Sequence, residues 1–251
     1  MDTMTNPLCA TQWRGKKVAF LGDSITDATH VGTDKNYWQF LQDFLGIEPL
    51  VFGINGQTWK EIPAQAQALW EAYGDAVDAI MVFAGTNDYN SSVPLGEWWR
   101  SAVEEANYDG TVLRRPRRHM LMNPETLRGR VNIAMRFMKE RFPRQQLILL
   151  TPIHRGFATF GENNVQPEET FPNAGGLYLE EYIAVLKEAG NVWAVPVIDL
   201  HAVSGLHPLT PAHHPYFHLA DTDLLHPSAE GHRRMALAML YPMLALPPDF
   251  K

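Results

Sequence analysis

Cysteine is nearly absent from this sequence of 251 residues, in which Cys9 is the single example. An intrachain disulfide needs two cysteines, so a fold held together by internal disulfides is excluded. The shortage of thiols fits a reducing compartment. Because Cys9 has no catalytic surroundings in the sequence, we interpret it as a structural or incidental residue.

Long apolar runs are also missing. No stretch approaches the ~20 apolar residues that a membrane-spanning helix requires. Residues 1–16 contain no apolar segment of the kind found in signal peptides. The chain as given therefore fits a cytoplasmic protein, whereas a signal peptide removed beforehand would fit a periplasmic or secreted one.

Positive charge is scarce relative to negative charge. The 21 lysines and arginines are outnumbered by 28 acidic residues, which gives a net charge of −7. Proteins that bind nucleic acids are normally basic, so no nucleic-acid partner is expected. One dense basic run, Arg114-Arg115-Pro116-Arg117-Arg118, is short, and we interpret it as a solvent-exposed loop rather than as a docking segment for an acidic partner.

What the sequence does contain is a regular alternation of two patterns. Short apolar runs typical of strands buried on both faces occupy residues 17–21, 49–54, 79–84, 147–152 and 195–200. Segments with helical spacing of apolar residues lie between and after them, at 35–45, 58–73, 124–141, 177–189 and 228–244. The alternation predicts a three-layer α/β/α fold, in which helices cover both faces of a five-stranded parallel sheet. No repeat or linker divides the chain, so residues 1–251 are expected to form a single domain.

Two segments follow neither pattern and are expected to be irregular inserts. In residues 86–123, Gly, Pro, Trp and Arg are mixed without a sustained period, apart from a short helical piece at 95–99; Asn123 then caps the next helix. Residues 154–176 form the second insert, and a loop rich in His and Pro is expected at 201–221. Long irregular segments in a compact domain are usually functional, mobile or folded over a site.

Polar turns follow the first three predicted strands. Their motifs are Gly22-Asp23-Ser24, Asn55-Gly56-Gln57 and Gly85-Thr86-Asn87-Asp88. The carboxyl ends of parallel strands meet at one edge of the sheet, where open α/β proteins bind their ligands. Each motif alone is weak, because Gly, Asn and Asp are common turn residues. Ser24 nevertheless stands where a nucleophile could use its own backbone N–H and the local helix dipole to hold negative charge on a reacting oxygen.

A carboxylate and an imidazole stand three residues apart, just before the last predicted helix. In a helical turn this spacing would bring Asp223 and His226 to one face. A carboxylate beside one ring nitrogen fixes the tautomer of a histidine and leaves the other nitrogen free to accept a hydroxyl proton. The alternative is an aspartate that starts a turn and a histidine that is merely packed.

Taken together, these four motifs resemble those of the SGNH, or GDSL-type, serine hydrolase family. They stand in the family's order, with Ile25 in place of the usual leucine: Gly22-Asp23-Ser24-Ile25, Gly56 in Asn55-Gly56-Gln57-Thr58, Gly85-Thr86-Asn87-Asp88, and Asp223-Leu224-Leu225-His226-Pro227. The resemblance implies a flavodoxin-like fold. It also implies an ester hydrolase that works without a metal ion or cofactor.

The same resemblance assigns roles to the site residues. Ser24 would be the nucleophile and His226 the general base and acid, with Asp223 orienting the histidine. The oxyanion hole would consist of the backbone N–H groups of Ser24 and Gly56 and the side-chain amide of Asn87. These roles suit the residue types, because a serine hydroxyl needs a base to become nucleophilic and an amide donates a hydrogen bond without adding charge.

Substrate class follows from the resemblance alone. Short-chain acyl esters and acetylated carbohydrates are the expected substrates, with a lysophospholipase or thioesterase as the enzymatic alternative and a carbohydrate-binding protein without turnover as the other. Trp59 and Tyr89, which follow the second and third motifs, are the expected pocket residues. Asp23 is interpreted as a structural residue of its turn. The sequence makes no prediction of the oligomeric state.

Histidine is concentrated near the end of the chain, where seven of the ten lie between His201 and His232. No His-Glu-x-x-His pattern occurs, and the single cysteine is distant in sequence. We therefore interpret these histidines as loop packing or substrate contacts and expect no metal site. His232 is interpreted as packed, and His154, at the predicted edge of the sheet, is given no role.

Overall fold

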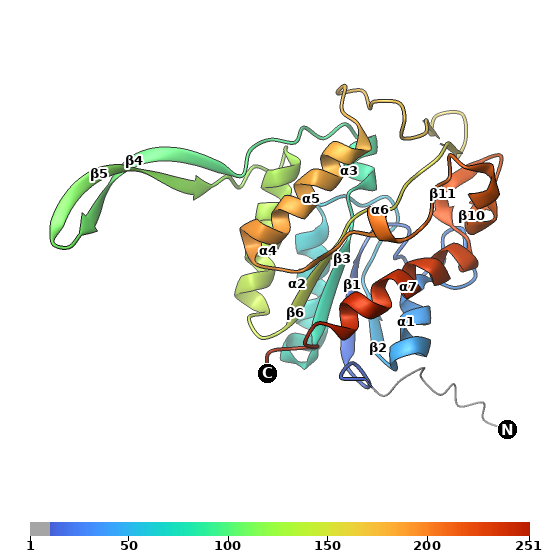
Figure 1. Ribbon diagram of the computed structural model, residues 1–251, viewed down its shortest axis with the longest axis horizontal. Coiled ribbons are helices and arrows are strands. Elements are labelled where there is room, and N and C mark those ends of the chain that lie inside the picture. The colour runs from blue at the N-terminus through green and yellow to red at the C-terminus, as the bar shows by residue number, and fades with distance from the viewer. Residues whose placement is uncertain (1–10) are drawn as a thin grey trace.

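A central parallel sheet organises the computed structural model, which describes residues 11–251 (Figure 1). Its strands run in the order β2-β1-β3-β6-β9, and every neighbouring pair is parallel. Their bounds are β1 Lys17–Gly22, β2 Glu48–Val51, β3 Ala79–Phe83, β6 Gln146–Leu150 and β9 Val197–Ile198. The predicted α/β fold with a five-stranded parallel sheet is confirmed.

Strand β1 explains why the predicted strands read as continuous apolar runs. Every residue of β1 after Lys17 is buried. Ala19 and Leu21 belong to the core on one face of the sheet, and Val18 and Phe20 belong to the core on the other face. A strand covered on both sides needs apolar side chains at successive positions, not at alternate ones.

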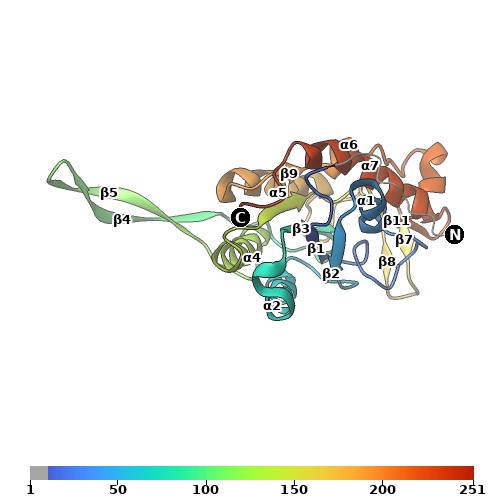
Figure 2. The same cartoon turned by 90° about the horizontal axis from the view of Figure 1, so that it is seen from below.

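Helices cover the two faces of this sheet (Figure 2). The face that includes Leu21 is covered by α2 (Ile62–Tyr73), α4 (Leu127–Arg141) and α5 (Leu179–Trp193). The face that includes Phe20 is covered by α1 (Tyr37–Leu45) and α7 (Ala229–Leu244). Each predicted helix is present, although several begin a few residues later than the pattern indicated.

The start of α4 corrects the expectation that Asn123 caps this helix. Thr126 has extended backbone, and its hydroxyl accepts a hydrogen bond from the N–H of Gly129 at 3.3 Å. Asn123 instead forms a separate turn before the helix, because its side chain accepts a hydrogen bond from the N–H of Glu125 at 3.0 Å and its carbonyl accepts one from the N–H of Thr126 at 3.3 Å. The helix therefore begins at Leu127, with Thr126 as its cap.

The largest departure from the sequence predictions lies in residues 86–123. They contain the short helix α3 (Thr86–Asn90) and a long antiparallel hairpin of β4 (Trp99–Tyr108) and β5 (Thr111–Met120). This hairpin, here called the arm, projects from the body of the molecule (Figures 1 and 2). The basic run at 114–118 is therefore part of a strand and not a loop, and the helical piece expected at 95–99 is absent.

The arm lacks the pattern by which half-buried strands are recognised. Residues on both of its faces are largely exposed, so apolar and polar side chains do not alternate. Val103, Tyr108 and Val112 are each more than half exposed. The dipeptide Asp109-Gly110 forms the turn with positive φ at both residues, which suits a two-residue hairpin loop.

The second expected insert, residues 154–176, remains mostly irregular but contributes to a small sheet. This sheet has the order β10-β11-β7-β8. Its strands are β7 (Ala158–Thr159), β8 (Val165–Gln166), β10 (Phe217–Leu219) and β11 (Asp223–Pro227). The segment 201–221 is likewise not a simple loop, because it overlaps α6 (Leu200–Val203) and contains η2 (Pro211–Tyr216) and β10.

No helix within residues 11–251 combines the length and the apolar character needed to cross a membrane. Cys9 lies outside the described residues, and so does the interpretation given to it. The one remaining named element of the described chain is η1 (Gly74–Ala76), a single turn that follows α2.

Candidate active site

Ser24 lies two residues beyond β1, in a turn that Gly22 makes possible. A Cβ atom on Gly22 would lie 2.3 Å from the carbonyl oxygen of Phe83 on the neighbouring strand, so no larger residue fits. The side-chain amide of Gln65 on α2 accepts a hydrogen bond from the N–H of Gly22 and donates one to its carbonyl, both at 2.8 Å. The chain is thus held firmly just before Ser24.

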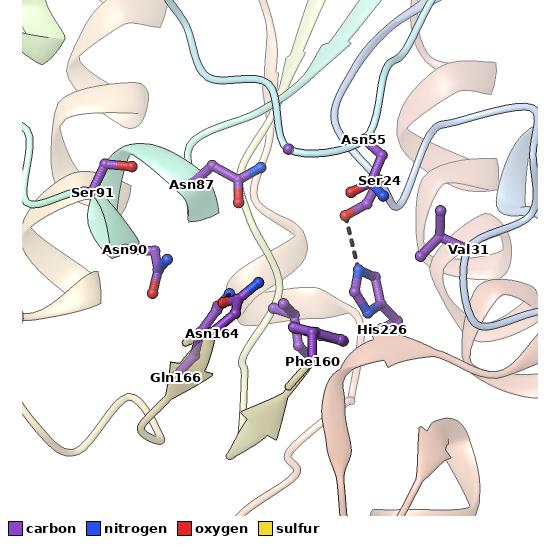
Figure 3. A pocket seen from close by; sticks show the side chains of 12 residues that line it. Ser24, Val31, Asn55, Asn87, Asn90, Ser91, Phe160, Asn164, Gln166 and His226 are labelled. Carbon is purple, nitrogen blue, oxygen red and sulfur yellow. Dashed lines mark hydrogen bonds between the residues drawn. The ribbon is translucent and has the colours of Figure 1, made fainter. Parts of the chain in front are cut away.

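Ser24, His226 and Asp223 lie in a hydrogen-bonded row. The Oγ atom of Ser24 is 2.9 Å from Nε2 of His226 (Figure 3). On the other side of the ring, Nδ1 of His226 is 2.9 Å from Oδ2 of Asp223. All three side chains are buried. This arrangement can transfer the serine proton to the imidazole while the carboxylate holds the ring in the required tautomer.

The backbone that carries Asp223 and His226 differs from the predicted helical turn. It is strand β11, where residues three apart normally point to opposite faces. The side chain of Asp223 overcomes this by folding back over its own backbone, because Oδ1 accepts hydrogen bonds from the N–H groups of Leu225 at 3.2 Å and His226 at 3.0 Å. The prediction of a helical turn at residues 223–226 was wrong, but the side chains of Asp223 and His226 still contact each other.

A second histidine contacts the same carboxylate and was not identified from the sequence. Nδ1 of His218 on β10 is 3.1 Å from Oδ2 of Asp223. Burial of Asp223 would raise the pKa of its carboxyl, but the hydrogen bond and charge of His226, with a smaller contribution from His218, outweigh it and lower the pKa below its ordinary value. Asp223 is therefore held in its ionised form. The only sequence signal for His218 was its place in the histidine-rich segment.

Gly56 stands at the tip of the turn that follows β2. The N–H of Gln57 donates to the carbonyl of Ile54 at 3.2 Å, and Gly56 has a φ of +78° with open space where a side chain would be. The N–H of Asn55 donates to Asp27 at 2.7 Å, which ties the turn to the segment after Ser24. Because Gly56 has no side chain, a ligand can approach the backbone of this turn closely.

Asn87 projects from α3 toward the same turn (Figure 3). Its Nδ2 donates a hydrogen bond to the carbonyl of Gln57 at 2.9 Å. An amide group has two N–H bonds, so the second remains for a ligand. The contact also keeps the turn that carries Gly56 and the helix that carries Asn87 at a fixed separation.

Asp88, the neighbour of Asn87, holds α3 in place through buried hydrogen bonds. Its carboxylate accepts hydrogen bonds from Arg130 at 2.9 Å and from the N–H of Trp59 at 3.0 Å. Complete burial raises the pKa of Asp88 to about 6, although the N–H of Trp59 and the guanidinium of Arg130 both lower it. The position of Asn87 thus depends on a buried ion pair with α4.

A cavity of about 360 Å³ opens beside Ser24 and His226. Its walls are mostly polar, and they include five amide side chains. The remaining lining residues are two serines, a glycine, the histidine and three apolar residues. The full lining comprises Ser24, Val31, Asn55, Gly56, Asn87, Asn90, Ser91, Phe160, Asn164, Gln166, Leu225 and His226.

Three lining residues come from the second insert, a segment that was expected to be functional, mobile or folded over a site. No sequence motif identified these residues. Phe160, Asn164 and Gln166 lie on or between β7 and β8, opposite Ser24 (Figure 3). The buried guanidinium of Arg155 donates a hydrogen bond to Gln166 at 2.6 Å and another to Thr86 at 3.2 Å. This wall of the cavity is therefore braced against the start of α3.

The expected pocket residues Trp59 and Tyr89 do not line the cavity. Trp59 is fully buried in the core, and its indole N–H donates to the carbonyl of Ala84 at 3.1 Å. Tyr89 faces Tyr182, and its hydroxyl donates to the carbonyl of Phe171 at 2.7 Å. Both aromatic rings stabilise the core beneath the site. The prediction that they form the pocket wall was wrong, because proximity in sequence does not set the side-chain direction.

Asp23 is completely buried beside Ser24 but does not touch the histidine. Its Oδ1 accepts a hydrogen bond from the N–H of Ile25 at 3.1 Å, in keeping with a structural residue of the turn. Burial raises its pKa to about 7, and the nearby charge of Asp88 adds to this, whereas the N–H of Ile25 and the charge of Arg155 oppose it.

His232 on α7 is packed, as its sequence position indicated. Its Nδ1 accepts a hydrogen bond from the N–H of Tyr37 at 3.1 Å, and the two rings stack at 6.0 Å. Burial is the main reason that its pKa falls to about 3. His154, by contrast, lies beside Glu169 and His201.

A family model gives the clearest similarity to known proteins. The model of the GDSL-like Lipase/Acylhydrolase family matches residues 20–234, which include Ser24, Gly56, Asn87, Asp223 and His226. None of the curated proteins matches this sequence.

Solved structures share the fold at low sequence identity. A protein from Lactobacillus plantarum is 23% identical, with 92% of this chain and 98% of that chain covered and a TM-score of 0.71. A possible lipase from Chitinophaga pinensis DSM 2588 is 22% identical, with coverages of 92% and 99% and a TM-score of 0.66. A protein described as an acetyl xylan esterase is 17% identical, with coverages of 90% and 98% and a TM-score of 0.53.

Proposed function

The chain belongs to the GDSL-like lipase/acylhydrolase family, and from this premise we propose that it is a serine esterase that hydrolyses carboxylic ester bonds through an acyl-enzyme intermediate. The observation that carries the proposal is the row from Ser24 through His226 to Asp223, with a distance of 2.9 Å at each contact. A binding protein without turnover would have no need of this row beside its cavity.

Acylation begins when Oγ of Ser24 attacks the carbonyl carbon of the ester while Nε2 of His226 takes the hydroxyl proton. The resulting tetrahedral intermediate carries a negative charge on the former carbonyl oxygen. The bond to the alcohol then breaks, and His226 gives its proton to the leaving oxygen. Asp223 stabilises the imidazolium that forms in between.

Three donors are assigned to the negative oxygen: the backbone N–H groups of Ser24 and Gly56 and the side-chain amide of Asn87. Fixed donors stabilise this charge more than water does, because they need not reorient during the reaction. Water then attacks the acyl group with help from His226, the acid departs, and the proton returns to Ser24.

We propose short-chain acyl esters or acetylated carbohydrates as substrates. The small cavity and its amide side chains support this choice, because Asn and Gln can both donate to and accept from sugar hydroxyl groups. The likeness to a protein described as an acetyl xylan esterase agrees with it. A lysophospholipase or thioesterase acting on long acyl chains is less favoured, since only Val31, Phe160 and Leu225 offer apolar walls.

The test compares the wild type with Ser24→Ala on p-nitrophenyl esters of increasing acyl length and on acetylated xylose and xylan. We expect the acetyl esters to be the best substrates and Ser24→Ala to lose at least about 10³-fold in kcat. Ser91→Ala is the matched control, because Ser91 lines the same cavity away from His226. Equal rates for wild type and Ser24→Ala would refute the mechanism, and a preference for octanoyl or longer esters would refute the substrate class.

A further inference from the structure

Three metal-binding side chains converge outside the cavity that holds Ser24. His154, Glu169 and His201 each offer one ligand atom, and these atoms all lie within 4.8 Å of one another. His154 follows β6, Glu169 follows β8, and His201 lies on α6. We propose that these three residues bind a single divalent transition-metal ion, with Zn²⁺ as the best match to their chemistry.

An unpaired nitrogen is the first observation that supports this site. Nδ1 of His201 is buried and has no hydrogen-bond partner within the described residues. A buried polar atom without a partner costs stability, and such atoms are uncommon in native proteins. The backbone N–H of His201 donates to Thr151 at 3.1 Å, which fixes the residue at the start of α6. A metal ion would satisfy the ring nitrogen that the protein leaves unpaired.

Glu169 supplies a buried carboxylate that is already oriented. Its Oε2 accepts a hydrogen bond from the backbone N–H of Arg155 at 2.9 Å, while Oε1 lies 2.5 Å from Nδ1 of His154. The second oxygen therefore points at the histidine pair. A bound cation would take the place of this hydrogen bond, with both side chains as its ligands.

The two imidazole rings lie close together, as two ligands of one ion would. The ring centres of His154 and His201 are 3.6 Å apart. A neutral imidazole is the form that binds metals. Three protein ligands leave the fourth position of a tetrahedral ion to water.

The location of the site indicates a structural role. None of the three ligands lines the cavity beside Ser24. They instead connect three segments, two of which flank the cavity wall formed by β7 and β8. Glu169 bonds to the backbone of Arg155, whose side chain holds Gln166 in that wall. A metal ion here would fasten the wall without touching the substrate.

The experiment uses the full chain without a polyhistidine tag, stripped with a chelator and titrated with Zn²⁺. We expect one equivalent of bound zinc by elemental analysis and a rise in Tm on binding. Both should be lost in His201→Ala and in His154→Ala. His119→Ala is the matched control, because His119 also lies 2.5 Å from a carboxylate, that of Glu104, but belongs to no three-residue cluster among the described residues.

A spectroscopic test on the wild type avoids dependence on the folding of variants. Co²⁺ in place of Zn²⁺ should give the strong visible absorption of a four-coordinate site. The weak spectrum of hydrated cobalt, less than half an equivalent of zinc, or undiminished zinc binding in His201→Ala would each overturn the proposal. None of these outcomes depends on esterase activity.

Discussion

His218 and His226 bond to the same carboxylate oxygen, with Oδ2 of Asp223 lying 3.1 Å from Nδ1 of His218 and 2.9 Å from Nδ1 of His226. His226 is buried, whereas the side chain of His218 is 43% exposed. The carboxylate thus has one partner that faces the serine and another that faces solvent.

His218→Ala should weaken activity without abolishing it. Removing this hydrogen bond raises the pKa of Asp223, because His218 is one of the groups that lower it. As the solution is acidified, Asp223 would then become protonated at a higher pH in the variant than in the wild type, and the activity that depends on its ionised form would be lost there. We expect kcat/KM for p-nitrophenyl acetate to fall by less than about 10-fold at pH 7. A pH–rate profile between pH 4 and 8 measures both effects. A loss as large as that of Ser24→Ala would contradict the supporting role.

Asn87→Ala should reduce kcat by about 10²–10³-fold with little change in KM, since the proposed amide donor acts mainly on the charge of the transition state. Asn90→Ala is the control, because Asn90 lies on the same helix and also lines the cavity. It should affect KM for acetylated sugars more than kcat. Steady-state kinetics on the two variants distinguish the roles, and similar kcat values for both would argue against Asn87 as an oxyanion donor.

Asp23→Asn should stabilise the protein at alkaline pH. The pKa of Asp23 is raised to about 7 in the folded state, against about 3.9 for an unfolded aspartate. Its contribution to stability is therefore fully present below pH 4 and is lost as the pH rises through 7. The asparagine carries no charge, so the variant avoids a penalty on the order of 4 kcal/mol at pH 8.

Thermal unfolding of the Asp23→Asn variant at two pH values checks this prediction. Its Tm should exceed that of the wild type by several degrees at pH 8, and the difference should shrink at pH 5. Asp34→Asn, at an exposed position, is the control for the loss of one carboxylate. A constant difference between Asp23→Asn and the wild type at both pH values would mean that the charge of Asp23 is not responsible.

Shortening the arm should leave the stability of the body unchanged. Ser101 and Arg118 are paired across the arm, so a two-residue turn can join them and remove residues 102–117. The removed strands pair mainly with each other, and we expect a Tm change below about 2 °C. Trp98→Ala provides the contrast, because Trp98 is buried at the base of the arm. This substitution should lower the free energy of unfolding by about 3–5 kcal/mol. Differential scanning calorimetry compares the two, and light scattering follows the oligomeric state.

Local rules predicted the sheet, whereas the residues placed around Ser24 were predicted from the polar turns together with the resemblance to a known family. β1 reads as a strand since it is buried on both faces, and the polar turns follow from where parallel strands end. The arm was not predicted, because its strands bury neither face and so carry no periodic pattern. Its one local signal was the turn dipeptide Asp109-Gly110.

The residues of the cavity wall could not be predicted from the sequence for another reason. Phe160, Asn164 and Gln166 reach the site through the pairing of β7 with β11, which joins segments about 65 residues apart, as in Asp223 with Ala158. Such pairings depend on the tertiary fold and leave no mark at short range. The proposed metal ligands His154, Glu169 and His201 likewise come from separate segments that only the tertiary fold brings together.

Gln65 completes the hydrogen bonding of the backbone just before Ser24. Its side-chain amide meets both the N–H and the carbonyl of Gly22, as the peptide group of a neighbouring strand would. A helix residue thus supplies the acceptor that the N–H of Gly22 lacks, while the carbonyl of Gly22 also accepts a hydrogen bond from the N–H of Ile54 at 3.1 Å. The chain after β2 therefore stays bonded to β1 as far as Ile54, and it turns away only at Asn55 and Gly56, with every backbone group of Gly22 satisfied.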